Sequence, residues 1–362
     1  MSANPATYAS VLSPDFVRAA TRARLRKGRV TTAVVSLCTA IVLLGLLAIP
    51  LFLLIGLHPG VPLPAQTWQR FEILLAGTLR AGTCAMLVAL PLGIATAMFS
   101  AHFCAPRLRA WLKPALEILE AIPTVVLGLI AAVTIAPWLK IHVATVLALI
   151  VVVPCVLLAA GMAFGKRVRR EGWLPLWLLP SVLAAIAVVV VIGARHSGVM
   201  IAPASPWNAA LVGLALGMAA VPLVFSVSED ALFLVPRAHT DAAFALGATR
   251  WQALTTVLLP AAGSGLVAAA LLGFSRCLGE TMIVLMASGN TPIAGFDPLA
   301  GLRSISADLA LGMPEAEPAS GAYRSLLLAA LLLLVLTLCV SALADAVRER
   351  LRRRLHAAAY AA

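Results

Sequence analysis

An all-α integral membrane protein is the fold class that this sequence predicts, and three observations lead to it. Hydrophobic residues fill 62% of the 362 positions, only 12% of residues are charged, and the mean hydropathy is +1.00. A soluble domain of this length would be far more polar. The apolar residues form long uninterrupted runs rather than the alternating ten-residue segments of an outer-membrane barrel. We therefore expect about eight transmembrane helices.

The apolar runs that predict these helices can be followed along the chain. We expect a basic cytoplasmic arm at 1–29, a first transmembrane anchor at 30–57, a transmembrane domain at 71–347 and a basic cytoplasmic tail at 348–362. The first run is too long for a signal-peptide core, which predicts an uncleaved anchor. The spans expected after the anchor are 71–101, 114–139, 143–165, 173–194, 208–233, 260–287 and 325–347. The segment 288–324, which contains four prolines, is expected to be an external loop.

The positions of the charged residues predict how the helices are oriented. The net charge of +12 would by itself fit a nucleic-acid-binding protein, but the charges lie in short segments beside the apolar runs. With the amino terminus inside, twenty of the 27 Lys and Arg residues fall on the cytoplasmic side, and six fall in outer segments or at span ends. This asymmetry follows the positive-inside rule and predicts that both termini are cytoplasmic.

Sequence motifs for metal binding or catalysis are not found. The six cysteines lie in or beside apolar runs and form no CxxC pair, and the six histidines have no ligand spacing. The sequence also has no GxxxxGK(S/T) motif for ATP and no recognisable nucleophile constellation. We therefore expect no metal, no cofactor and no enzymatic activity in this chain.

The segment 235–290 carries the most informative pattern. A short amphipathic helix is predicted before Gly247, which is expected to end it. Asp241 is expected in the first turn of that helix, where the helix dipole favours a carboxylate. The full pattern is Asp241-Ala242-Ala243, three residues, Gly247, nine residues, Val257, one residue, then Leu259-Pro260.

This pattern is similar to the cytoplasmic signature E-A-A-x3-G-x9-I-x-L-P of the permease subunits of bacterial ABC importers, with Asp for Glu and Val for Ile. The resemblance implies that residues 236–256 contain a coupling helix, which docks into a groove on a separate ATPase subunit. The signature positions that match are Asp241, Ala242, Ala243, Gly247, Leu259 and Pro260. The alternative interpretation is an incidental amphipathic helix at the membrane interface.

Arg276, Glu280 and Thr281 lie inside the predicted span at 260–287 and are candidates for the substrate path. The two charged residues are four apart, so they are expected on one face of a helix. Ionisable groups at membrane depth usually face the bundle interior or a water-filled path. One interpretation is a self-neutralising structural pair. The other is an anion contact, in which Arg276 binds anionic oxygens and Glu280 offsets its charge.

The stretch around this pair, 273–293, resembles the Arg-x-x-Gly-Glu-Thr-Met region of phosphate-importer permeases of PstC type. Segments 119–128 and 301–328 resemble other parts of the same group, and 143–194 looks like a two-helix insertion into its six-helix core. The resemblance implies a bacterial inner membrane subunit that works with a second permease of PstA type, cytoplasmic ATP-binding subunits and a periplasmic phosphate-binding protein. Two alternatives stay open: a permease for another oxyanion, such as sulfate or molybdate, and an ion-coupled secondary transporter. The second would be expected to show inverted repeats, which we do not see.

The charge asymmetry generates a topology prediction. A reporter enzyme fused after Arg170 or after Arg350 should be active on the cytoplasmic side, and one fused within 295–320 should be active on the periplasmic side. Reporter activity in cells expressing each fusion measures this directly. A cytoplasmic signal from 295–320 would contradict the eight-span topology.

Overall fold

The structure is a computed structural model that describes residues 14–57, 62–142, 205–295, 297–318 and 320–361. It divides into two units, Met1–Gly60 and Val61–Ala362, which are described separately below. Within the described residues all regular elements are helices. Six of these helical segments are long and apolar enough to cross a membrane: Thr31–Gly56, Thr67–His102, Thr124–His142, Ala209–Phe233, Arg250–Gly279 and Gly321–Arg350. The expected spans at 143–165 and 173–194 lie outside the described residues.

The first unit consists of one helix, α2 (Pro14–Gly56). Its apolar part, Thr31–Gly56, has 26 residues, which at 1.5 Å per residue reaches about 39 Å and exceeds a bilayer core of about 30 Å. Nearly all of its large apolar side chains are exposed within the unit, as expected for a helix that meets lipid. The helix is continuous from 14 to 56, so residues 14–29 of the expected basic arm and the expected anchor share one element, while residues 1–13 lie outside the described residues.

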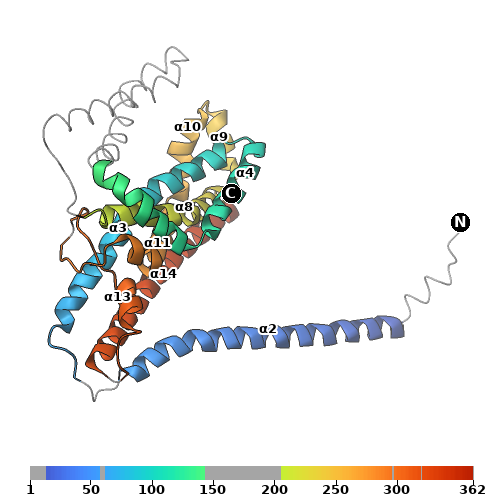
Figure 1. Cartoon of the computed structure of the whole chain (residues 1–362). Coiled ribbons are helices and arrows are strands. Elements are labelled where there is room, and N and C mark those ends of the chain that lie inside the picture. Colours follow the sequence, from blue (N-terminus) through green and yellow to red (C-terminus); the bar gives the residue numbers. More distant parts are fainter. Residues whose placement is uncertain (1–13, 58–61, 143–204, 296, 319, 362) are drawn as a thin grey trace, which may run out of the picture. The chain divides into compact units, whose positions relative to one another are not determined.

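The second unit, which we call the bundle, is built around two helices, α3 (Thr67–His102) and α8 (Ala209–Phe233) (Figure 1). They form the most extensive helix pair in the described chain. Two further long helices, α11 (Leu259–Gly279) and α14 (Gly321–Ala361), pack together, and α11 also contacts α3 and α8. The expected spans at 71–101, 208–233 and 325–347 correspond to α3, α8 and α14.

Small residues allow α3 and α8 to approach closely. A Cβ atom built at Gly213 of α8 would lie 2.5 Å from Cβ of Cys84, and one at Gly217 would lie 2.7 Å from the carbonyl oxygen of Ala85. The backbones are therefore nearly in van der Waals contact. Lipid offers no hydrophobic force that would drive helices together, so such close packing is the main source of helix association in a membrane.

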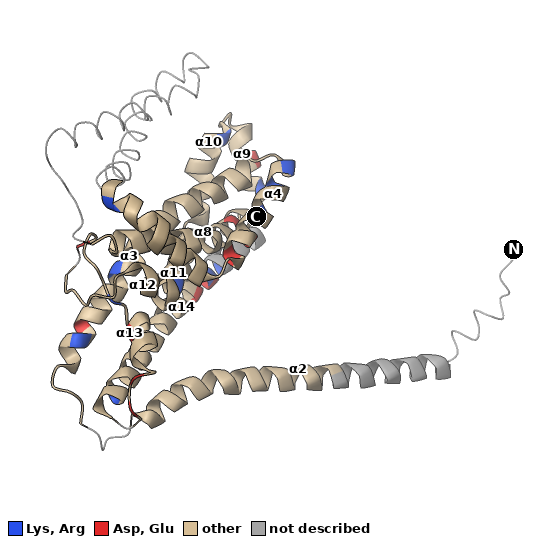
Figure 2. Cartoon of the chain, viewed as in Figure 1, with Lys and Arg blue, Asp and Glu red and all other residues tan. Residues whose placement is uncertain are grey.

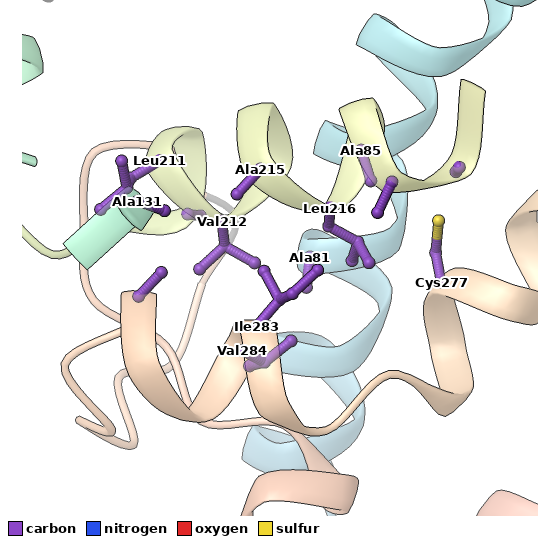
Figure 3. Close-up of a cluster of buried hydrophobic side chains, with 14 of the residues drawn as sticks. Ala81, Ala85, Ala131, Leu211, Val212, Ala215, Leu216, Cys277, Ile283 and Val284 are labelled. Atoms are coloured by element: carbon purple, nitrogen blue, oxygen red, sulfur yellow. The ribbon is translucent and has the colours of Figure 1, made fainter. Parts of the chain in front are cut away.

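The main core of the bundle lies where α3 and α8 meet the segments around 131 and 283 (Figure 3). Ala81 and Ala85 of α3 face Val212 and Leu216 of α8. Ile283 and its neighbour Val284 fill the same cluster from a short helix, α12 (Met282–Ala287). Nearly all of these side chains are aliphatic and fully buried, so this part of the bundle is a rigid framework rather than an open path.

The expected span at 114–139 is wrong in its boundaries. The chain instead forms an amphipathic helix, α4 (Pro106–Ala121), followed by α5 (Thr124–Ile130) and a π-helical turn, η1 (Ala131–Ile135). The break falls at Ile122-Pro123, where Ile122 is extended because the proline ring disfavours helical backbone in the preceding residue. The membrane-length segment begins only at Thr124.

The expected helix at 260–287 also differs. It begins earlier, with α10 (Arg250–Ala253) and a second π-helical turn, η2 (Leu254–Leu258), which run directly into α11. It then ends at Gly279, and α12 starts after a two-residue break. Apolar composition alone did not reveal the break, because the residues on both sides of it are hydrophobic.

The segment 288–324 is not simply an exposed external loop. It contains α13 (Ile305–Gly312), whose first four residues are buried and which packs against α3 and α14. Arg80 of α3 donates hydrogen bonds to the carbonyl oxygens of Gly295 (3.0 Å), Asp297 (3.1 Å) and Gly301 (2.6 Å). A side chain of a span thus supplies polar partners for this irregular backbone.

A buried ion cluster anchors α13 itself. The Asp308 carboxylate, in the first turn of α13, accepts hydrogen bonds from Arg70 at 2.8 Å and forms an ion pair with Arg303 at 3.0 Å. The Thr78 hydroxyl of α3 accepts a hydrogen bond from the backbone N–H of Ile305 at 3.0 Å. The polar groups at this end of the bundle are therefore largely paired with one another.

The close contact of α3 and α8 leads to a stability prediction. Gly213→Ala should lower the free energy of unfolding by about 1–3 kcal/mol, because the new methyl group meets the Cys84 side chain and backbone. Gly263→Ala on α11 is the matched control, since its Cβ would meet nothing within 4 Å. Thermal unfolding of the purified protein in detergent should show a lower transition temperature for Gly213→Ala and an unchanged or higher transition temperature for Gly263→Ala. Equal effects would contradict the packing argument.

Candidate functional site

The short helix predicted before Gly247 is present as α9 (Arg237–Ala245). Gly247 ends it with a φ of +81°, a left-handed conformation that residues with a side chain rarely adopt. The turn is closed by hydrogen bonds from the N–H of Gly247 to the carbonyl of Phe244 (2.9 Å) and from the N–H of Ala248 to that of Ala243 (3.0 Å). This backbone geometry gives a physical reason for glycine at the centre of the signature.

Asp241 was expected in the first turn of this helix, and that position is wrong. The chain is extended at Pro236, so the helix begins at Arg237 and Asp241 is its fifth residue. Asp241 and Ala242 are both exposed, and Ala243 is buried. The signature therefore presents its carboxylate and one alanine outward, while the second alanine packs inward.

The signature continues through a capped restart of the helix. The Thr249 side chain accepts a hydrogen bond from the N–H of Gln252, whose side chain in turn accepts one from the N–H of Thr249. This capping box fixes the direction in which α10 leaves the turn. Pro260 is the second residue of α11 and follows the π-helical turn η2 inside the continuous helical segment Arg250–Gly279, so it lacks one backbone donor there.

Apolar side chains are exposed around this turn. Leu246 is 90% exposed, and Phe244 and Trp251 are also exposed. In Figure 1, α9 and α10 lie with α4 at one end of the bundle, away from α13, and we call this the α9 end. Charged residues mark this end in Figure 2, while the middle of the bundle is largely uncharged. An exposed apolar patch with a polar rim is typical of a protein-docking surface.

Arg276 and Glu280 do not share one helical face, contrary to the sequence-based expectation. Arg276 lies in the last turn of α11, but Glu280 follows the end of that helix with an extended backbone. The Glu280 carboxylate accepts a hydrogen bond from the N–H of Met282 (3.2 Å), and its carbonyl accepts one from the Ser306 hydroxyl (2.8 Å). Glu280 and Thr281 thus form the break between α11 and α12, and α13 helps to satisfy the freed backbone.

The ion pair that Arg276 makes in the described chain is with Glu120, in the last turn of α4, at 3.9 Å. Both side chains are partly exposed, at 37% for Arg276 and 47% for Glu120. A contact this long and this exposed holds the guanidinium loosely, so most of its five donors are available to another oxygen ligand.

A buried polar group at the α9 end was missed by the sequence analysis. The Glu229 carboxylate of α8 is only 4% exposed, and it accepts a hydrogen bond from the Ser100 hydroxyl of α3 at 2.6 Å. It also forms an ion pair with Arg109 of α4 at 3.1 Å, and that guanidinium lies 4.2 Å from the centre of the Phe233 ring. The signal that could have revealed it is a carboxylate placed more than a turn before the end of an apolar span.

Across the part of the chain that the structure describes, no three His, Cys, Asp or Glu side chains gather in a way that could hold a metal ion. The polar groups that do converge are arginines and carboxylates, which suit anion contacts and helix positioning.

Comparison with known proteins identifies the family. Residues 89–353 match the model of a protein family described as "Binding-protein-dependent transport system inner membrane component". The chain is 27% identical to phosphate transport system permease protein PstC 1 of Mycobacterium tuberculosis over 299 residues, covering 81% of this chain and 76% of the relative. It is 28% identical over 283 residues to PstC of Haemophilus influenzae (76% and 75% covered), and 26% identical over 285 residues to PstC of Pasteurella multocida (77% and 74% covered). The chain therefore belongs to the binding-protein-dependent inner membrane transport components, which are non-catalytic permease subunits of ABC importers.

Proposed function

We propose that this chain is the PstC-type permease subunit of an ATP-driven importer of inorganic phosphate. The observation that favours phosphate over other oxyanions as the substrate is the similarity of this chain to several phosphate permeases over about three quarters or more of its length. In this proposal the chain forms half of the translocation path, and a second permease of PstA type forms the other half. Cytoplasmic ATP-binding subunits and a periplasmic phosphate-binding protein complete the importer.

The α9 end is proposed to face the cytoplasm and to bind the ATPase through residues 236–256. Three features support this: the signature spacing, the exposed apolar residues around Leu246, and the positive charges expected on that side. Within the signature, Asp241 and Ala242 would meet the ATPase. Ala243, Gly247, Leu259 and Pro260 would fix the backbone that presents them.

Arg276 is proposed as an anion contact of the path, with Glu280 and Thr281 beside it at the helix break. A guanidinium offers a planar fork of donors that matches phosphate oxygens. The break supports the proposal, since irregular backbone at membrane depth is tolerated only where it is buried in protein or lines a water-filled cavity. Nearby carboxylates keep the site from binding an anion too tightly to release it.

Uptake measurements test the proposed substrate. A strain that lacks this chain should lose energy-dependent uptake of radiolabelled phosphate at low external concentration, and the wild-type chain should restore it. Sulfate and molybdate uptake by the same strain serve as controls. Normal phosphate uptake together with lost sulfate or molybdate uptake would instead assign the chain to another oxyanion.

The same assay tests Arg276. Arg276→Gln should lower phosphate uptake at least tenfold while the chain still assembles, because its ion pair with Glu120 is half exposed and contributes less than about 1 kcal/mol to stability. Glu120→Gln, which removes that partner, should assemble equally well. The double variant Arg276→Gln, Glu280→Gln removes both charges and should stay inactive. Full uptake by the double variant would refute a role for this pair in anion passage.

The turn at Gly247 generates a coupling prediction. Gly247→Val forces a β-branched residue to a φ of +81°, at a cost of at least about 1–2 kcal/mol, so the exposed turn should change shape. Retention of the ATPase on the purified permease should fall about tenfold, with the amount of permease in the membrane unchanged. Gly247→Asn is the matched control, because asparagine tolerates this backbone region, and it should retain the ATPase. Equal retention by both variants would mean that this turn does not contact the ATPase.

A further inference from the structure

Glu229 is a buried carboxylate whose partners come from two other helices. Ser100 of α3 and Arg109 of α4 both contact it, at 2.6 Å and 3.1 Å. Burying a charge is costly unless it is paired, and a hydrophobic residue could fill the same space without that cost. The ion pair of Glu229 with Arg109 is therefore not explained by packing energy alone. It joins α8 to α4, which indicates a role in positioning these two helices.

The helix held by this carboxylate, α4, is otherwise weakly attached. None of its sixteen residues is fully buried. Its half-buried Leu112 and Leu116 rest on a small cluster that also contains Val235, just before α9, and Leu254 of η2. The position of α4 relative to α8 therefore depends strongly on the contacts of Arg109 with Glu229 and with the Phe233 ring.

The two ends of α4 meet two different parts of the bundle. Arg109, near its start, is paired with Glu229, which lies on the helix that leads through Val235 into α9. Glu120, near its end, contacts Arg276. Glu120 is eleven positions after Arg109, which corresponds to about 16 Å along the helix axis. The helix α4, which includes Pro114 between these two residues, thus links the last turns of α8 to the arginine beside the break of α11.

We propose that Glu229 is a positioning residue that couples α4 to the ATPase-docking segment, so that movement of α9 is passed through Arg109 to α4, whose far end lies beside Arg276. The proposal rests on the docking of an ATPase at α9, but it does not depend on which anion is carried. Neutral Glu229→Gln would still accept the Ser100 hydrogen bond, yet it would lose the charge that holds Arg109. The α9 end would then move without α4.

The distance between α4 and α11 reports this coupling without any transported solute. Nitroxide labels are attached at Ile118→Cys on α4 and Val267→Cys on α11, two exposed sites, in a chain whose six native cysteines are replaced by alanine. The assembled complex with its ATPase is measured by pulsed electron paramagnetic resonance, without nucleotide and with ATP plus vanadate. The labelled chain with Glu229 and Arg109 intact should show a nucleotide-dependent shift in the distance distribution.

Glu229→Gln and Arg109→Gln should each lose at least half of that shift, while Glu229→Asp should keep most of it. Arg109 is 37% exposed, so its variant tests the proposal even if the buried change prevents assembly. Asp308→Asn is the control: it neutralises another buried, arginine-paired carboxylate in α13, away from α9, and it should keep the shift. Three outcomes would overturn the proposed coupling. They are a full distance shift in Glu229→Gln, a loss of the shift in Asp308→Asn equal to that in Glu229→Gln, and no shift in the labelled chain with Glu229 and Arg109 intact. Phosphate uptake and ATPase retention are measured for the same variants, and they show separately whether the proposed transport function fails.

Discussion

The close approach of α3 and α8 is the constraint on which the rest of the bundle depends. Small residues on both helices bring their backbones nearly into contact, and the remaining elements pack around that pair. Membrane helices gain little from hydrophobic association, so a wedge between these two would not be compensated elsewhere. Around this framework, three parts of the chain depart from regular membrane spans: the turn at Gly247, the break after Gly279 and the amphipathic helix α4.

The turn at Gly247 is closed by local hydrogen bonds, but elsewhere polar side chains from one element complete the backbone or charge of another. Ser306 of α13 satisfies the carbonyl freed at the break, and Arg80 holds the loop near 295–301. Glu229 holds α4. Each is a contact between residues far apart in the sequence, in surroundings where an unpaired polar group would be costly. These polar residues thus position the helices and irregular segments of this membrane protein.

The sequence predicted the elements whose signal is local. Long apolar runs identified the spans at α3, α8 and α14, and the pattern around Gly247 identified a short helix that ends there. The restart of the helix at Arg250 was not predicted. The sequence did not predict where Glu280 lies, because the four-residue spacing from Arg276 assumes an unbroken helix. At the break, the Glu280 carbonyl accepts a hydrogen bond from Ser306, which belongs to a segment distant in the sequence. Glu229 was missed for a similar reason, since both of its partners come from other helices. Ile122-Pro123 was a local signal for the end of α4 that the apolar run concealed.

The π-helical turn η2 has a consequence for the orientation of the α9 end. A π-turn is an α-helical stretch that contains one additional residue, and it stands between the capped α10 and the membrane helix α11. The wider winding of the π-turn takes up that residue, so the helical segment continues from α10 into α11 without a break. Loss of one residue within η2 would restore regular α-helical winding and change the orientation of α10 only slightly. Loss of one residue within α11 would instead rotate everything on its amino-terminal side by about 100° around the helix axis. The orientation of the α9 end is therefore less sensitive to chain length at η2 than in the regular helix that follows it.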